Sequence, residues 1–235
     1  MQRLTIDPQQ LQENQIALTA PQLHYLQRVM RLQNGAKFQV IDGAGSLYLV
    51  ELSADYGRVL EQSIPIGIEL PVKVSLIVAV PKIGLDDVVR ACTELGVSEI
   101  YPVTSDRTIV QPSEQKRRRW VEIAKEATEQ SERLIVPTIH PVQPWKTIGM
   151  QVTGQRKICA ARGDSQHLMS CLDLEKSVSI AIGPEGGWTD RELQQSIELG
   201  WQSVSLGQRV LRTITAPLAV MSMISGLTES SEIQP

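Results

Sequence analysis

The chain has 235 residues, of which 42% are hydrophobic and 21% are charged, and its formal net charge is −3 at pH 7. This composition is typical of a soluble protein, and the acidic balance excludes RNA binding through overall charge, so any RNA contact requires a local basic patch. No apolar run approaches the ~20 residues that span a bilayer, and the first residues lack the apolar centre of a signal peptide. Because the three cysteines and three histidines lack disulfide-framework or metal-ligand spacing, we expect a cytoplasmic protein with no metal and no membrane partner.

Residues 1–72 predict a small β-rich domain. The segment 20–32 has the apolar periodicity of a short helix. Its apolar stripe consists of Leu23, Leu26, Val29 and Met30. Two stretches of alternating apolar and polar residues flank Gly43–Gly45, which is the pattern of a β-hairpin. The Pro- and Gly-punctuated segment 64–71 indicates a domain junction.

From residue 73 to residue 228, apolar strands alternate with amphipathic helices, which predicts a doubly wound α/β domain with helices on both faces of a parallel sheet. The expected strands cover residues 72–80, 97–103, 156–161, 178–183 and 203–207. The expected helices cover residues 85–96, 113–131, 166–171, 189–200 and 217–227. Thr189 and Glu192 have the spacing of a capping box. The tail, residues 229–235, is expected to be disordered.

Three loops that follow predicted strands carry candidate site residues, because ligands of open α/β sheets bind at the carboxyl ends of strands. The first loop contains Arg107, the second is Gly183–Gly187, and the third runs from Leu206 to Pro217 with Arg209 and Arg212. Each glycine loop is also compatible with a plain strand-to-helix connection, and both arginines with bonds to helix carboxylates or carbonyls. Motifs typical of NAD binding, NTP binding and serine hydrolases are absent.

The roles of two basic segments are open, because each fits two alternatives. The densest basic run, Lys116–Trp120, fits either phosphate contacts or a solvated helix face that a tryptophan anchors. Arg28 and Arg31 in the first domain fit either RNA contacts or the solvent-facing side of an amphipathic helix.

Taken together, these stretches resemble the RsmE family, the 16S rRNA uracil-N3 methyltransferases of the SPOUT superfamily. The segment Ile182–Ile224 carries the GPEGG loop and the SLG-x-R-x-LR-T-x-TA pattern of that family. Upstream, the segments Thr93–Val103, Ser105–Thr108 and Glu122–Pro137 match in order, and His24–Gly45 resembles the family's small barrel. The resemblance therefore covers almost the whole chain.

The resemblance implies an α/β fold made of a SPOUT-type domain with a C-terminal trefoil knot, preceded by a PUA-like β-barrel. Residues 1–72 would form the PUA-like RNA-binding domain, residues 73–228 the methyltransferase domain, and residues 229–235 a tail. The implied cofactor is S-adenosyl-L-methionine, and the implied partners are a second copy of the chain in a homodimer and 16S rRNA of the small ribosomal subunit. The implied activity is methylation of N3 of a uridine in the decoding region.

By position, the resemblance implies catalytic roles for Arg3, Arg209 and Arg212. The expected cofactor-binding residues lie in or beside two loops: Gly183, Pro184, Glu185, Gly186, Gly187, Leu206, Gly207, Leu211, Thr213, Thr215 and Ala216. The expected RNA contacts are Arg28, Arg31, Lys82, Arg107 and Arg133. Gly186 and Gly187 would leave space for the cofactor, and no metal site is implied.

Two residues depart from the family pattern. Glu132 replaces a usual glycine, and Ile214 replaces a frequent glutamate, so that glutamate cannot act as a catalytic group here. Glu185 and Asp106 are candidates for the base that would accept the N3 proton, and the sequence does not decide between them. Two alternatives remain: a non-catalytic RNA-binding or ribosome-assembly protein with this fold, and a SPOUT methyltransferase that modifies another RNA acceptor.

Overall fold

The computed structural model describes residues 3–161 and 164–229. Contacts between α-carbons divide the chain into two units. The first unit contains the residues up to Glu69 together with Thr128–Val136, and the second contains Leu70–Ala127 and the chain from Pro137 onwards. The first unit is thus made of two separate chain segments. Apart from Glu229, the tail that we expect to be disordered lies outside the described residues.

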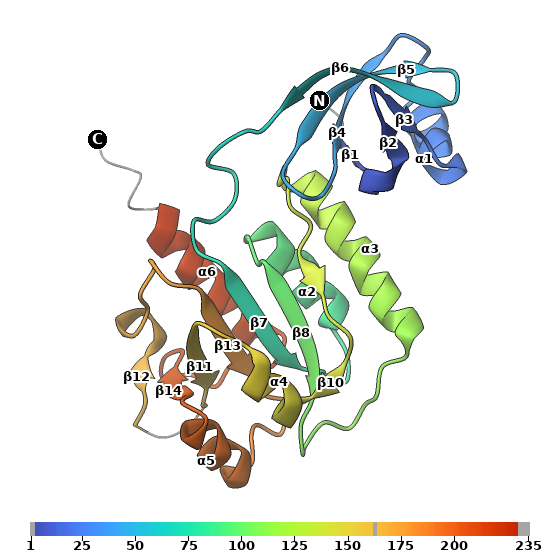
Figure 1. Ribbon diagram of the computed structural model, residues 1–235. Helices are drawn as coiled ribbons and strands as arrows, with labels where there is room; N and C mark the ends of the chain where they lie inside the picture. The colour runs from blue at the N-terminus through green and yellow to red at the C-terminus, as the bar shows by residue number, and fades with distance from the viewer. Residues whose placement is uncertain (1–2, 162–163, 230–235) are drawn as a thin grey trace. The chain divides into compact units, whose positions relative to one another are not determined.

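The first unit is built on a six-stranded sheet with the order β1-β4-β5-β6-β3-β2. Its strands are β1 (Arg3–Thr5), β2 (Leu11–Gln12), β3 (Gln15–Ala17), β4 (Lys37–Ile41), β5 (Leu47–Ser53) and β6 (Tyr56–Ser63) (Figure 1). The predicted hairpin is confirmed, because β4 and β5 pair antiparallel around the Gly43–Gly45 turn. Alternate residues of these strands, such as Phe38 and Val50, are fully buried in one core.

The predicted helix of the first unit consists of two different helical segments. It begins as α1 (Ala20–His24) and continues as a π-helical turn over Tyr25–Val29, where the Met30 N–H donates to the Tyr25 carbonyl at 2.9 Å. Leu26 is fully buried as expected, but Val29 is 59% exposed. The prediction that Val29 shares the buried stripe is therefore wrong, because the wider turn rotates the residues after Leu26 away from α-helical positions.

Arg3 on β1 holds the separate segment Thr128–Val136. Its guanidinium donates to the main-chain carbonyl of Glu132 and pairs with the Glu132 carboxylate at 3.3 Å. Glu132 has a φ of +61°, a left-handed conformation that glycine adopts without cost. Backbone geometry therefore accounts for the family's usual glycine, and the bonds from Arg3 hold Glu132 in the same conformation. The neighbouring Arg133 is buried and pairs with Glu69 at 2.6 Å.

The second unit is a parallel sheet with the order β10-β8-β7-β13-β11-β14-β12, and β9 pairs with β8. Its strands are β7 (Val74–Ala79), β8 (Glu99–Thr104), β9 (Thr138–Ile139), β10 (Gln143–Pro144), β11 (Gln155–Cys159), β12 (Gln166–His167), β13 (Val178–Ile182) and β14 (Gln202–Ser205). Its helices are α2 (Leu85–Glu94), α4 (Trp145–Gln151), α5 (Asp190–Glu198), α6 (Thr215–Glu229) and most of α3 (Glu114–Gln130). β13 lies between β7 and β11, and β14 lies between β11 and β12, so the last two strands insert between earlier ones. The trefoil knot remains a prediction.

Helices cover both faces of this sheet, as the alternation of elements predicts. All residues of β7 and β13 are buried. On one face, Ile77 and Ala181 pack against α4 and α5, where Trp145 contacts Trp188 and Trp201 with ring centroids 5.0 and 4.8 Å apart. Figure 1 shows α2 and α6 on the opposite face. This arrangement confirms the doubly wound α/β class.

Two elements of the second unit differ from the prediction. The expected helix over residues 166–171 is wrong: Gln166–His167 form the edge strand β12 beside β14, and Leu168–Ser170 form a single 3-10 turn. The turn is fixed because Leu168 is fully buried and His167 Nδ1 accepts the Met169 N–H at 3.3 Å. Helix α4 was not predicted, because Gly149 interrupts a segment of seven residues that is too short for a clear periodicity.

Replacing Glu132 by glycine is expected to raise the free energy of unfolding by up to about 1 kcal/mol, because glycine removes the cost of a side chain at positive φ. The exposed carboxylate of Glu132 contributes little through its ion pair, and Arg3 keeps its bond to the carbonyl. The midpoint of urea unfolding measures this change. Glu132→Ala is the control, since it removes the same carboxylate but retains a β-carbon and should lower stability. An equal decrease in the free energy of unfolding in both variants would contradict the role of the positive φ.

Candidate functional site

Four loops meet at the carboxyl edge of the parallel sheet in the second unit. They follow β7, β8, β13 and β14, which lie close together in the sheet order. Because all these strands run in the same direction, their loops emerge at one edge. The structure therefore brings together Lys82 after β7, Arg107 after β8, the Gly183–Gly187 loop after β13 and the Leu206–Arg212 loop after β14.

Glu185 joins two of these loops. Its carboxylate accepts the main-chain N–H of Lys82 at 2.9 Å. Its own loop is closed by a separate bond, from the Gly187 N–H to the Pro184 carbonyl at 2.8 Å. The carboxylate thus positions the loop after β7 against the loop after β13.

Arg107 supports the glycine loop from the neighbouring strand. Its guanidinium donates to the Gly186 carbonyl at 2.7 Å and lies 3.4 Å from the Trp188 carbonyl. A β-carbon at Gly186 would lie 3.2 Å from Arg107 Cδ, whereas one at Gly187 would meet nothing within 4 Å. Gly186 therefore makes room for Arg107, and of the two glycines expected to leave space for a cofactor, Gly187 is the one where an added β-carbon would meet no atom within 4 Å. Gly187 also has a φ of +69°.

Asp106 is bonded to the start of α5. The predicted capping box is confirmed, with the Glu192 N–H donating to Thr189 Oγ1 at 3.2 Å and the Thr189 N–H to Glu192 at 2.8 Å. The Asp106 N–H donates to the other Glu192 oxygen at 2.9 Å, and its carboxylate accepts from Thr189 Oγ1 at 3.3 Å. Both carboxylates considered as proton acceptors, those of Glu185 and Asp106, therefore hold loops in place.

The loop after β14 presents two arginines to solvent. Arg209 and Arg212 are exposed, and within the part of the chain that the structure describes neither side chain has a hydrogen bond or an ion pair. The alternative that they bond helix carboxylates or carbonyls is thus not observed. The Arg212 carbonyl instead accepts the Thr215 and Ala216 N–H groups, both at 2.9 Å, and so begins α6. Gly207 has a φ of +115° and open space beside it.

The expected cofactor residues differ in exposure. Exposed are Glu185, Gly186, Gly207 and Thr215; half-buried are Gly183, Gly187, Leu206 and Leu211; buried are Pro184, Thr213 and Ala216. Ile214, the second departure from the family pattern, packs on the loop after β7, where its Cγ2 would lie 2.9 Å from a β-carbon added to Gly84. The isoleucine thus has a packing role at this position.

Four of the expected functional arginines belong to the first unit. Arg28 and Arg31 are exposed and available to a ligand. Arg3 and Arg133 are largely buried, and their guanidinium groups face Glu132 and Glu69. This burial argues against the RNA contact expected for Arg133 and gives the catalytic candidate Arg3 a structural role in its own unit.

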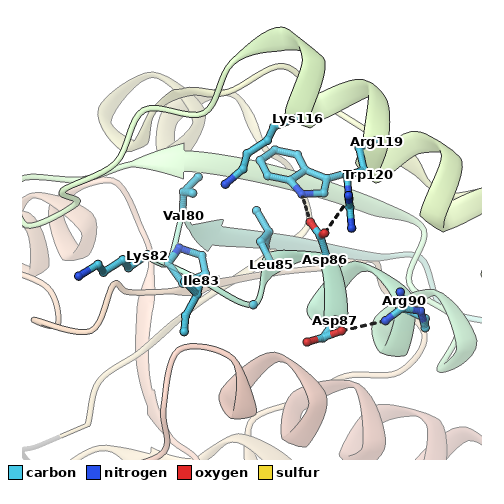
Figure 2. Close-up of a pocket in the computed structure, with 12 residues that line it drawn as sticks. Val80, Lys82, Ile83, Leu85, Asp86, Asp87, Arg90, Lys116, Arg119 and Trp120 are labelled. Atoms are coloured by element: carbon cyan, nitrogen blue, oxygen red, sulfur yellow. Dashed lines mark hydrogen bonds and ion pairs between the residues drawn. The ribbon is translucent and has the colours of Figure 1, made fainter.

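An open cavity of about 310 Å³ lies beside the loop after β7, and Figure 2 shows its lining. The lining comes from that loop, from α2 and from the first part of α3: Val80, Pro81, Lys82, Ile83, Gly84, Leu85, Asp86, Asp87, Arg90, Lys116, Arg119 and Trp120. A second cavity of about 250 Å³ lies between the end of β8 and helices α4 and α5. Neither cavity is lined by the expected cofactor residues. No residue spacing in the sequence links Asp86 to the basic run in α3, which lies about thirty positions further along the chain.

Two further properties concern residues 3–161 and 164–229. Within these ranges, no three His, Cys, Asp or Glu side chains lie close enough together to hold a metal ion. None of the helices formed there is long and apolar enough to cross a membrane.

Comparisons with known proteins agree with the motifs. The RNA methyltransferase domain family matches residues 68–225, and the RNA methyltransferase PUA domain family matches residues 18–58. Ribosomal RNA small subunit methyltransferase E of Synechocystis sp. is 40% identical over 97% of this chain and 78% of its own length, and that of Bacillus subtilis is 30% identical over 97% and 98%. The crystal structure of the Neisseria gonorrhoeae protein of this name, bound to S-adenosyl methionine, superimposes with a TM-score of 0.88, 30% identity and coverage of 97% and 98%. The chain therefore belongs to the ribosomal RNA small subunit methyltransferase E family, the RsmE family that its motifs resemble.

Proposed function

We propose that this protein uses S-adenosyl-L-methionine to methylate N3 of a uridine in the decoding region of 16S rRNA. One observation carries the proposal: the Gly183–Gly187 and Leu206–Arg212 loops lie at one sheet edge, and the side chains of Arg209 and Arg212 have no partner among the residues that the structure describes. The relative from Neisseria gonorrhoeae, whose structure is bound to S-adenosyl methionine, supports the choice of cofactor. The proposed location is the cytoplasm, where the small ribosomal subunit is assembled.

The residues present fit this cofactor. Gly187 and Gly207 have positive φ values and no atom within 4 Å of an added β-carbon, so main-chain groups there are open to a ligand. Leu206 and Leu211 are half-buried and offer apolar surface, and the Thr215 hydroxyl is exposed. We propose that these five residues hold S-adenosyl-L-methionine, which supplies an electrophilic methyl group when bound.

The acceptor determines what the protein side chains must do. N3 of uracil carries a proton at neutral pH, and this proton leaves as the nitrogen gains the methyl group. Arg209 and Arg212 are free to donate hydrogen bonds to the uracil carbonyl oxygens, where negative charge develops. Glu185 and Asp106 are already bonded to neighbouring loops. We therefore propose stabilisation of the anionic imide by arginine, with the proton passing to solvent.

The target uridine must be unstacked and unpaired, because its N3 edge is occupied in a base pair. We further propose that the protein acts as a homodimer. Val210, which is 67% exposed on the loop after β14, is an apolar side chain that such a partner would cover. Both departures from the family pattern, Glu132 and Ile214, have backbone or packing explanations and so give no support to a non-catalytic protein.

Deleting the gene is expected to remove N3-methyluridine from 16S rRNA, and supplying the intact chain should restore it. Mass spectrometry of nuclease digests of 16S rRNA measures the nucleoside directly. N3-methyluridine at its normal level in the deletion strain would refute the proposed acceptor. Loss of a different methylated nucleoside would favour a SPOUT enzyme with another acceptor.

Replacing Arg212 by alanine should lower kcat by roughly 10²- to 10³-fold, the usual effect of removing one donor to a developing anion. The Kd for S-adenosyl-L-methionine should change by less than about threefold. Arg212→Lys should retain part of the activity, because it keeps the charge without the planar fork. Lys176→Ala is the control, since Lys176 is exposed and precedes β13 at the opposite edge. A large rise in the Kd with unchanged kcat would instead assign Arg212 to cofactor binding.

Substitution of Glu185 separates positioning from proton transfer. Glu185→Gln keeps an oxygen that accepts the Lys82 N–H, so kcat should stay within about threefold of the unmodified protein. Loss of a general base would lower kcat by roughly 10²- to 10⁴-fold. Glu185→Ala should lower activity, and it should also speed hydrogen exchange at the Lys82 amide. Exchange at that amide equal to that of the unmodified protein would contradict the positioning role.

A further inference from the structure

The cavity between α2 and α3 is a second feature at the same edge of the sheet. We call it the α2–α3 groove and define it by the twelve lining residues given above. It adjoins the candidate site through the loop after β7. In that loop, the Lys82 N–H is bonded to Glu185 and Gly84 packs against Ile214. The groove therefore continues the candidate site outward between the two helices.

Internal bonds engage both acidic side chains of the groove. Asp86 accepts from Trp120 Nε1 at 2.9 Å and from Arg119 Nε at 2.8 Å. Asp87 pairs with Arg90 at 2.8 Å. These bonds, drawn in Figure 2, leave neither aspartate to balance the remaining positive charges of the lining.

Two lysines of the groove remain without a partner. Lys116 and Lys82 are exposed, and in the described part of the chain their ammonium groups have no hydrogen bond or ion pair. Figure 2 shows Lys116 reaching from α3 over the cavity towards the loop after β7, and Lys82 extending outward from that loop. The free charge of the groove is positive, so it suits an anionic ligand.

These contacts also settle the role of the basic run. Trp120 is 1% exposed and anchors α3 through Asp86, so its ring is not available for base stacking. Arg117 pairs with Glu114 and Arg119 pairs with Asp86. Arg118 lies 4.0 Å from Glu114, so among the described residues Lys116 is the cation of this run that has no partner, and it faces the groove.

We propose that the α2–α3 groove holds a backbone phosphate of the RNA strand that flanks the methylated nucleotide, with Lys116 as the main contact and Lys82 at the rim. This inference rests on the proposed function, since it requires an RNA strand to enter the neighbouring site. The groove is open and offers few converging donors, which suits a phosphodiester of a polymer that is held elsewhere as well. A free anion would depend on the two flexible lysines alone.

Binding of a labelled transcript of the 16S rRNA decoding region at several salt concentrations tests the proposal. Lys116→Glu should weaken binding by roughly tenfold at 0.1 M salt, and the slope of log K against log salt should fall by about 0.7 to 1. Lys125→Glu is the matched control, because it makes the same charge change on the same helix. Lys125 lies nine residues after Lys116, and this spacing places it on the opposite side of the helix. The control should weaken binding by less than about twofold.

Protection of lysines from acetylation provides a second measurement on the unmodified protein. RNA should protect Lys116 at least threefold more than Lys125. Equal effects of the two substitutions, no RNA binding by the unmodified protein, or protection of Lys116 by inorganic phosphate but not by RNA would each overturn the groove assignment.

Calorimetry with S-adenosyl-L-methionine and the methylation assay keep the two proposals apart. Lys116→Glu should bind the cofactor with unchanged Kd while it loses RNA affinity. If the unmodified protein binds RNA through Lys116 but transfers no methyl group, the groove stands and the proposed activity fails. If it methylates uridine and Lys116→Glu binds RNA normally, the activity stands and the groove assignment fails.

Discussion

The common direction of the strands in the second unit is the constraint on which the candidate site depends. A parallel sheet carries all its strand ends of one kind at one edge, so loops separated by more than one hundred residues meet there without any interaction that is specific to the loops. Local bonds then fix their relative positions. Glu185 ties the loop after β13 to the loop after β7, Arg107 ties it to the loop after β8, and Ile214 packs on Gly84. The common direction of the strands brings the loops together, and these three contacts fix the positions of the loops relative to one another.

The same edge explains how a chain with a net charge of −3 presents positive groups to RNA. The carboxylates there are used internally: Glu185, Asp106 and Asp86 each accept hydrogen bonds from the protein itself. The cations at this edge differ in whether they have a partner. Arg107 and Arg119 are engaged, whereas Arg209, Arg212, Lys82 and Lys116 point into solvent without partners in the described chain. The local pairing of charged side chains, rather than the overall composition of the chain, thus determines the charge of the surface that a ligand contacts.

Sequence patterns predicted the second unit well, because its strands are continuous apolar runs and its long helices have clear periodicity. The buried strand β7 and the capping box at Thr189 are examples. Sequence patterns did not predict the structure where a long-range contact or an unusual turn determines it. The π-helical turn that exposes Val29, the edge strand that replaces the expected helix at Gln166, and the bond between Arg3 and Glu132 have no local signature. For the site, motifs located the loops, but the protein partners of Glu185 and Gly186 required the structure. The roles of individual residues in binding and catalysis remain predictions.

The division of the first unit into two chain segments has a consequence for the order of synthesis. The segment Thr128–Val136 follows β7, α2, β8 and most of α3 along the chain. Arg3 and Glu69 therefore remain without Glu132 and Arg133 until the ribosome has translated more than half of the protein. Domains usually fold one after another from the N-terminus. Here the N-terminal unit must wait for its last segment, which ends at Val136, so its folding is expected to be delayed until the first part of the second unit has also been translated.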